Sequence, residues 1–332
     1  MKRLGFKVIL CIVTVFLLLN CAEDTSNDVA VVTADAQRIN HRLKEIRGTI
    51  ERLKIKAIDV LHHVEKYQDG LYDSKRYAFF KDTVFYTPEN DGFCEVWASG
   101  IVPVDEVLFS KIKALENLCT DMDRIYHENN IFSAVYLNTK SSVVVAFPYA
   151  STNTYLKPEL DTRQAWVTYW AADADHNPDR KTLWVGPYLD ALGYGYMVSI
   201  ITPVYRGDRM EAAIGFDITC ESLRDLFLAD TRRNLMLINE KGYLTAANAG
   251  CSKLIGIEGP GSHDYLEKAS ENRPAPEKFN LHINSNRIIR ELAAKVAATT
   301  APFDLVLGGR PYKVIHAGIE DAGWYLVELK GS

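Results

Sequence analysis

A single apolar stripe near the N-terminus leaves this chain few architectures. Between positions 36 and 67, apolar residues recur at spacings of three and four without a slip. The stripe consists of Ala36, Ile39, Leu43, Ile46, Ile50, Leu53, Ala57, Val60, Val64 and Tyr67. Such spacing puts these side chains on one face of a helix, which we place at residues 34–67 and expect to be roughly 50 Å long. A stripe this narrow fits pairing with a partner chain, and it fits equally a spine along the chain's own domain.

The rest of the chain alternates between β-type runs and two further helix patterns. Strand patterns in the first part cover residues 94–99, 132–137, 143–147, 197–204 and 211–218, and a helix pattern covers 105–126. Strand patterns in the second part cover residues 235–238, 243–247, 303–307, 312–317 and 324–328, and a helix pattern covers 287–298. Hairpins packed against helices are typical of PAS-like antiparallel sheets. We therefore predict an α+β fold in which two such subdomains, residues 68–227 and 228–332, follow the long helix.

The first residues predict export. Three basic residues within the first seven positions precede an uncharged apolar run, Val8–Leu19, and a polar segment follows at once. This order is typical of a secretory signal, and a run of about twelve residues is shorter than the roughly 20 that a membrane span needs. We predict a signal peptide over residues 1–20 and a polar tether over 21–33. An uncleaved N-terminal anchor helix is the alternative.

The end of the apolar run suggests a lipid anchor. Leu17–Cys21 resembles the bacterial lipobox, in which the cysteine is acylated and becomes the new N-terminus, although Asn20 stands where a small residue is usual. The resemblance implies lipidation of Cys21. Several acyl chains give stable anchoring, so we expect an exported protein that is held to a membrane and faces the periplasm or the cell exterior.

The four cysteines inside the predicted mature chain carry no metal motif. They are widely spaced, at Cys94, Cys119, Cys220 and Cys251, and no C-x-x-C pair occurs. An oxidising compartment permits disulfides, and four cysteines allow three connectivities. We nevertheless expect buried free thiols, and neither a metal nor a cofactor.

Three segments together resemble the double-Cache extracellular sensor family. The first is Asp161–Trp166 with Tyr169–Ala172, the second runs from Trp184–Asp190 into Ser199–Tyr205, and the third is Ala213–Thr219. The closing Gly323–Val327 also matches the last strand of the family. The resemblance covers residues 34–329. It implies two stacked PAS-like modules, with a small ligand in the membrane-distal module.

The same region holds the candidate ligand site. We predict that it is formed by Trp166, Tyr169, Trp170, Tyr188, Asp190, Tyr196 and Asp217. Aromatic faces and a carboxylate suit an amine or another cation, whereas rings that only build a core are the alternative. The resemblance makes Asp217 the residue that holds the ligand amine. A carboxylate near the end of an apolar strand also needs a partner if it is buried.

The ligand class stays open at this point. Where amino-acid-binding members of the family have an arginine and a tyrosine, this chain has Gln164 and Val167. An amine, a nucleobase-like ring and a small organic acid all remain candidates.

Composition and motifs argue against other functions. The net charge is −5 and no basic stripe is interleaved with aromatics, so we expect no nucleic-acid partner. No nucleophile-elbow, zinc-protease or phosphate-loop motif occurs, so we do not expect an enzyme. A structural or adaptor lipoprotein without a ligand, and a hydrolytic enzyme, are the alternatives. With no effector domain after the last strand, we expect signalling through a homodimer or a membrane partner, docked on the apolar stripe.

Overall fold

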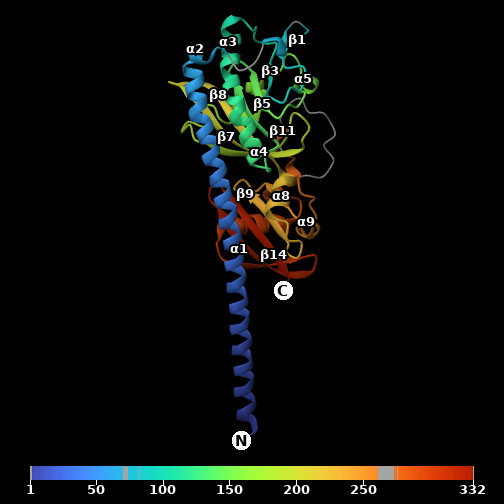
Figure 1. Ribbon diagram of the computed structural model, residues 1–332. Coiled ribbons are helices and arrows are strands. Elements are labelled where there is room, and N and C mark those ends of the chain that lie inside the picture. Colours follow the sequence, from blue (N-terminus) through green and yellow to red (C-terminus); the bar gives the residue numbers. More distant parts are fainter. Residues whose placement is uncertain (1, 70–73, 82, 261–272, 275, 332) are drawn as a thin grey trace.

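One long helix carries two sheet modules stacked along its length. The computed structural model describes residues 2–69, 74–81, 83–260, 273–274 and 276–331, with backbone alone for 2–25 and 273–274. Helix α1 (Lys2–His62) runs past both modules and continues beyond them at its N-terminal end (Figure 1). The short α2 (Val64–Tyr67) follows a break at His63. Residues 21–33, which we predicted to be a polar tether, are part of this helix.

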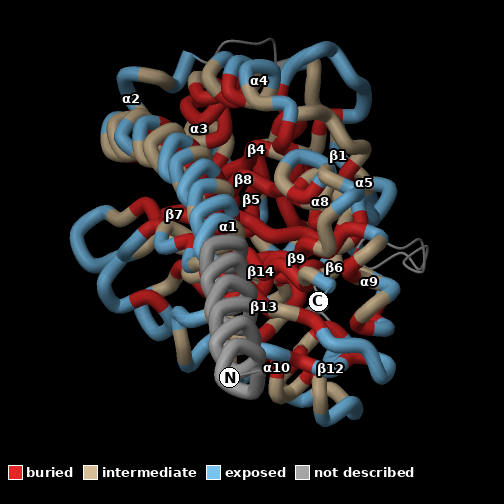
Figure 2. Tube along the Cα trace, turned by 90° about the horizontal axis from the view of Figure 1, so that it is seen from below, coloured by how far each residue is buried: buried red, intermediate tan, exposed pale blue. Residues whose placement is uncertain are grey.

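The apolar stripe of α1 packs on the chain's own modules. From Ala36 to Val60 its members are at most 3% exposed, and they join one continuous core with both sheets. The strands behind α1 are largely buried (Figure 2). A stripe used in this way is unavailable to a partner, so the expectation that it is the docking or dimer surface is wrong. The spine alternative is correct.

The first module is built on an antiparallel sheet. Its order among the described residues is β1-β2-β3-β5-β4-β8-β7-β6-β11. The strands are β1 (Ala78–Phe80), β2 (Val84–Tyr86), β3 (Glu95–Ala98), β4 (Ala134–Thr139), β5 (Val143–Phe147), β6 (Leu183–Leu189), β7 (Tyr196–Arg206), β8 (Arg209–Thr219) and β11 (Arg273–Pro274). Strand β11 follows the start of the second module in sequence but pairs with β6, so the two halves of the chain are interlocked.

Strand alternation gives this sheet two different faces. Helix α1, with α3 (Glu106–Leu115) and α4 (Cys119–Glu128), covers the face that carries Val135, Leu137 and Phe216. The opposite face carries side chains of the other parity, and three short helices lie over it. These are α5 (Thr152–Tyr155), α6 (Thr162–Ala165) and α7 (Val167–Trp170). The space between this face and the short helices holds the candidate site.

The second module repeats the plan with a five-stranded sheet, in the order β10-β9-β14-β13-β12. Its strands are β9 (Leu235–Asn239), β10 (Leu244–Ala247), β12 (Phe303–Leu307), β13 (Arg310–Ile319) and β14 (Trp324–Gly331). Its helices are α9 (Ala249–Ile255) and α10 (Arg287–Ala298), and α8 (Cys220–Phe227) joins the modules. Single 3-10 turns occupy 74–76, 116–118, 277–279 and 281–283.

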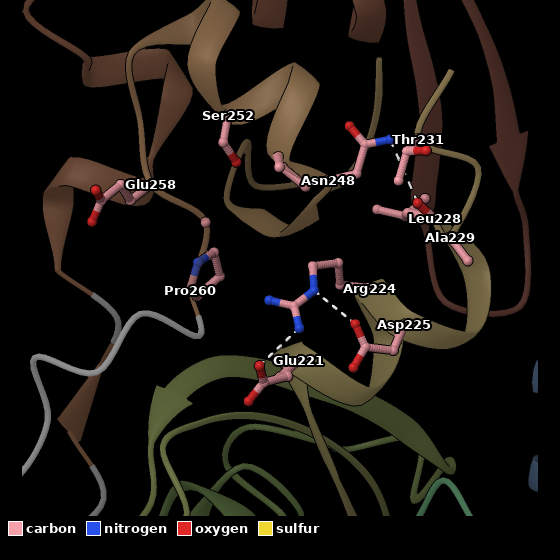
Figure 3. Close-up of a pocket in the computed structure, with 13 residues that line it drawn as sticks. Glu221, Arg224, Asp225, Leu228, Ala229, Thr231, Asn248, Ser252, Glu258 and Pro260 are labelled. Atoms are coloured by element: carbon pink, nitrogen blue, oxygen red, sulfur yellow. Dashed lines mark hydrogen bonds and ion pairs between the residues drawn. The ribbon is translucent and has the colours of Figure 1, made fainter. Parts of the chain in front are cut away.

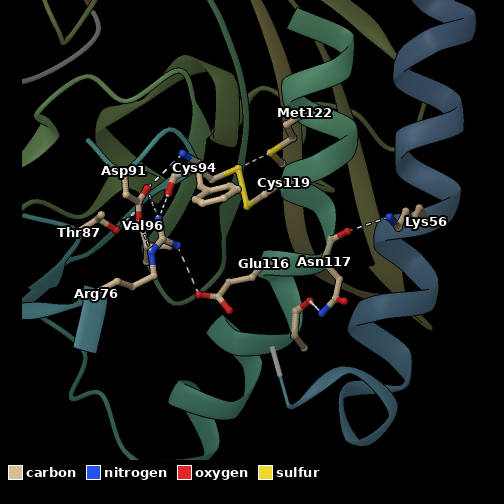
Figure 4. The surroundings of a disulfide bond; sticks show 12 residues. Lys56, Arg76, Thr87, Asp91, Cys94, Val96, Glu116, Asn117, Cys119 and Met122 are labelled. Carbon is tan, nitrogen blue, oxygen red and sulfur yellow. Dashed lines mark hydrogen bonds and ion pairs between the residues drawn. A yellow bond between two sulfur atoms is a disulfide. The ribbon is translucent and has the colours of Figure 1, made fainter. Parts of the chain in front are cut away.

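Two of the cysteines are paired. Cys94 and Cys119 form a disulfide with their Cα atoms 5.5 Å apart, joining the start of β3 to the start of α4 (Figure 4). The expectation of a free thiol is wrong for these two, because the fold brings the N-terminal end of α4 over β3. Cys220 and Cys251 are free and buried.

Candidate functional site

A small cavity lies between the first sheet and the short helices. Its volume is about 50 Å³. It is lined by Ala134, Tyr136, Val144, Ala146, Thr152, Trp166, Thr168, Tyr188, Asp190, Ala191, Leu192 and Asp217. Four of the seven residues predicted from the sequence are among them: Trp166, Tyr188, Asp190 and Asp217.

Asp217 lies at the centre of a hydroxyl cluster. Strand register sets it beside Ala134 of β4 and Ser199 of β7. The hydroxyl of Ser199 donates to its Oδ1 atom at 2.6 Å, the hydroxyl of Tyr136 at 3.0 Å, and that of Tyr188 at 3.3 Å. No hydrogen bond from the described residues reaches Oδ2. One carboxylate oxygen thus accepts three hydrogen bonds, and the other has no donor among the described residues.

The pKa of Asp217 is raised from 3.8 to about 7. Burial is the main cause and the nearby charge of Asp190 adds to it, while the three hydroxyl donors lower the pKa in part. Burial also raises the pKa of Asp190 to about 6. None of the described lining residues is basic. Two carboxylates share an enclosed space without a counter-charge, and such a space attracts a cation.

Asp190 also shapes the wall of the cavity. Its Oδ2 atom accepts the backbone N–H groups of Leu192 and Tyr194 at 2.9 and 3.1 Å. Its own N–H donates to the carbonyl of Gly195 at 2.9 Å, which closes the turn between β6 and β7. The bonds to Leu192 and Tyr194 fold the turn that brings Ala191 and Leu192 onto the cavity, so Asp190 has a structural role whatever the ligand.

Trp166 lines the same cavity and carries a hydrogen-bond donor left unpaired by the part of the chain that the structure describes. Asp161 caps the preceding helix by accepting the N–H of Arg163, and the chain then turns at Trp166 into α7. The indole Nε1 of Trp166 is buried and has no partner among the described residues. A buried donor without an acceptor costs about 1–3 kcal/mol, so an acceptor atom on a bound ligand would be favoured here.

The structure places the other three predicted residues outside the cavity lining. Tyr169 packs with Ile201 and Ala213 farther along the sheet. The ring of Trp170 lies 5.0 Å from that of His176. Tyr196 packs on Phe279 at 5.1 Å between ring centres. Tyr196 has the opposite strand parity to Ser199, and this sends its side chain to the other face of the sheet.

Two residues of the cluster were missed in the sequence. Tyr136 alternates with the core residues Val135 and Leu137, and Ser199 is the single hydroxyl within the run Met197–Ile201 of β7. A lone polar residue at the same parity in neighbouring strands is a signal for a shared buried cluster. The signal needs the strand order, which the sequence did not provide.

A larger hollow of about 740 Å³ lies between α8 and α9 (Figure 3). Arg224 points into it, and its guanidinium already donates to Glu221 at 2.7 Å and to Asp225 at 2.8 Å. None of the predicted site residues lines this hollow. The paired charges give it no evident ligand chemistry.

No family model and no curated protein sequence matches this chain. Solved ligand-binding domains of chemoreceptors do match it. The domain of the Pseudomonas aeruginosa amino acid chemoreceptor PctC, in complex with GABA, is 14% identical, with 92% of this chain and 99% of that chain covered and a TM-score of 0.51. The domain of the Pseudomonas fluorescens chemoreceptor CtaA, in complex with L-isoleucine, is 15% identical, with 94% of both chains covered and a TM-score of 0.49. A long helix that carries two stacked PAS-like sheets, shared with the PctC domain over almost its whole length, is the double-Cache fold.

Proposed function

We propose that this chain is an extracytoplasmic small-molecule sensor module and that its ligand is a small amine bound at Asp217. The observation that carries the proposal is the burial and the incomplete hydrogen bonding of the Asp217 carboxylate. It is buried beside Asp190, its Oδ1 atom takes three hydroxyl donors, and Oδ2 faces no donor from the described residues. An ammonium group supplies the missing positive charge and the missing donors together. The fold supports a binding role, because the PctC domain of the same fold was solved with GABA.

The cavity favours an amine without a carboxylate. Arg163, next to Gln164 in the sequence, is not among the residues that line the cavity. Its guanidinium bonds Asp161 at 2.7 Å and the carbonyl of Lys140 at 3.2 Å instead. Trp166 does line the cavity, and its neutral indole N–H is buried without a partner among the described residues. A ligand with an ammonium group at one end and a hydroxyl or amide oxygen at the other meets both partners.

Binding requires the cavity to open. Its volume of about 50 Å³ is far below the roughly 300 Å³ at which ordinary ligand pockets begin. The wall that contains Thr152 is held by Glu95, which accepts the N–H groups of Ala150 at 2.8 Å and of Thr152 at 2.6 Å. Displacement of this wall on binding is the conformational change by which a sensor reports its ligand.

Export and anchoring complete the proposal. A disulfide in the first module suits an oxidising compartment. Of the helices within the described residues, none has the length and apolar composition that crossing a membrane requires.

Cys21 lies in the part of α1 whose side chains are not described, and its lipidation remains a prediction. Intact mass of membrane-extracted protein tests it: an acylated chain beginning at Cys21 is expected, and a chain beginning at Met1 would contradict it.

A thermal-shift screen tests the amine. Butylamine, ethanolamine and 4-aminobutanamide should raise the melting temperature of the wild type at pH 8, while the matching alcohols should not. Asp217→Asn keeps the shape and an acceptor for the hydroxyls, and it should lose the response to every amine, at a cost of more than tenfold in affinity. Asp208→Asn, at a fully exposed turn position, is the matched control and should respond like the wild type.

Two outcomes would count against the proposal. If no amine shifts the wild type, the ligand-free adaptor becomes the better description of this fold. If amines bind Asp217→Asn as tightly as the wild type, the module is a sensor whose site lies elsewhere.

A further inference from the structure

A second groove lies at the junction of the two modules. Its volume is about 280 Å³, close to the lower end of the range for small-molecule pockets. The first module contributes α7, His176 and β6, and the second module contributes the β9–β10 turn and the start of β14. The side chains that matter for the argument are Trp170, His176, Trp184, Glu240, Lys241 and Trp324.

The walls of the groove are aromatic. Trp184 and Trp324 lie with ring centres 5.4 Å apart and planes inclined at 58°. Trp170 lies 5.0 Å from His176, also at 58°. Three of the five tryptophans of the chain therefore line one groove. Indole faces attract cations more strongly than the other aromatic side chains do.

The mouth of the groove holds an uncommitted carboxylate. Glu240 is exposed in the β9–β10 turn, and it forms no hydrogen bond or ion pair with any described residue. Its Oε2 atom comes within 3.0 Å of the position that a Cβ atom would take at Gly323, so the carboxylate leans over the turn before Trp324. Lys241 lines the same mouth, and its positive charge offsets the negative charge of Glu240. The attraction for a cationic ligand must then come mainly from the aromatic faces. Such faces favour a weakly hydrated cation, because a metal ion or a primary ammonium would lose more of its hydration on binding.

The groove is held open by contacts that join three parts of the molecule. The indole of Trp184 donates to Asp321 Oδ2 at 3.0 Å, and Arg47 of α1 donates to Asp321 Oδ1 at 2.8 Å. Asn239 of the second module donates to the carbonyl of Gly186 in β6 at 3.1 Å. These bonds fix the tryptophan walls before any ligand arrives, which lowers the cost of binding.

We propose that this groove is a second ligand site and that it takes a small quaternary ammonium compound. Methyl groups around a delocalised positive charge pack against the indole faces, and the Glu240 carboxylate supplies the counter-charge at the mouth. The site differs in chemistry from the Asp217 cavity, where the carboxylate needs N–H donors that a quaternary ammonium group lacks. Because its walls come from both modules, an occupant contacts both at once.

Nuclear magnetic resonance tests this site with tetramethylammonium chloride as the probe. Saturation transfer to the methyl protons should report binding. The indole N–H signals of Trp170, Trp184 and Trp324 should shift on titration, while those of Trp97 and Trp166 stay in place. Ammonium chloride at equal ionic strength should leave the signals of Trp170, Trp184 and Trp324 in place. Each signal is assigned by a single Trp→Phe replacement.

Variants separate this site from the amine cavity. Glu240→Gln and Trp170→Leu should each weaken binding of the probe by roughly threefold or more. Asp217→Asn, and Glu258→Gln at an exposed acid elsewhere on the second module, should bind it like the wild type. Glu240 is at the surface, so its variant folds even if Trp170→Leu does not. An absence of saturation transfer, shifts confined to Trp97 and Trp166, or unchanged affinity in Glu240→Gln would each overturn the proposal.

Discussion

At the scale of single residues, Asp217 shows how a buried charge can be kept available. Three hydroxyls hold one carboxylate oxygen in place, and this orients the group without neutralising it. Hydroxyl donors favour the ionised form less than a basic side chain would, so burial still dominates and the pKa stays near 7. The carboxylate therefore gains more from a cationic ligand than a carboxylate already in a salt bridge would gain.

This pKa makes stability depend on pH in an unusual direction for an aspartate. The folded-state pKa of Asp217 is about 7 and the ordinary value is 3.8, so its contribution to stability is complete below pH 4 and is lost as the pH rises through 7. Three pKa units correspond to a loss of as much as about 4 kcal/mol. Asp217→Asn should remove most of this loss, and urea unfolding at pH 4, 6 and 8 measures it. Parallel pH profiles for variant and wild type would mean that the carboxylate is not buried in this way.

The candidate residues could be predicted in part from the sequence. The sequence did not show which face of the sheet each side chain takes, because that depends on strand register. Asp217 could be named because it is a charge in an apolar strand, and Trp166 because it belongs to an aromatic segment that resembles the sensor family. Tyr196 lies outside the cavity lining, because aromatic density alone does not say which face of the sheet a ring takes. Tyr136 could not be assigned to the site without knowing that β4 pairs with β8, and this pairing joins segments far apart in the sequence.

At the scale of elements, α1 shows why a regular stripe did not reveal its partner. Its period of three and four is common to a coiled coil and to a helix packed on a sheet. The strands β9, β10, β12 and β13, and helix α10, could be predicted to within a few residues, because each has a clear period and a turn at its end. Strands β1, β2 and β11 are two or three residues long, too short to carry a pattern.

Two isoleucines on α1 test its role as a spine. Ile50 is fully buried and Ile55 is 68% exposed on the same helix. Ile50→Ala should lower the free energy of unfolding by about 2–5 kcal/mol through the cavity it leaves. Ile55→Ala should change it by less than about 0.5 kcal/mol. Equal small effects, accompanied by loss of self-association in Ile50→Ala, would instead restore the docking interpretation.

The Cys94–Cys119 disulfide ties a strand to a helix across 25 residues of sequence. A closed loop of this length restricts the unfolded chain, and its loss costs about 3 kcal/mol. Replacing both cysteines with alanine should lower the midpoint of urea unfolding accordingly, and a reductant should lower that of the wild type but leave the variant unchanged. A wild type insensitive to reductant while folded and unfolded would show that the bond does not form.

At the scale of the whole molecule, the two modules behave as one folding unit. Their cores are continuous through α1, and Arg47 reaches both of them by bonding Asp321 and the carbonyl of Thr182. We expect a single cooperative transition that is the same by tryptophan fluorescence and by circular dichroism. Arg47→Ala leaves Asp321 without its cation and should separate the two probes, whereas Arg38→Ala, at an exposed position on the same helix, should not.

The closed state of the Asp217 cavity has a kinetic consequence. If the wall held by Glu95 must move before a ligand can enter, the association rate will follow ligand concentration only while capture is slower than opening. At high ligand concentration the observed rate should level off at the opening rate, as conformational selection requires. The response of such a module would lag behind a rise in amine concentration by the time that the cavity takes to open, so a pulse of amine shorter than that time would occupy few of the molecules.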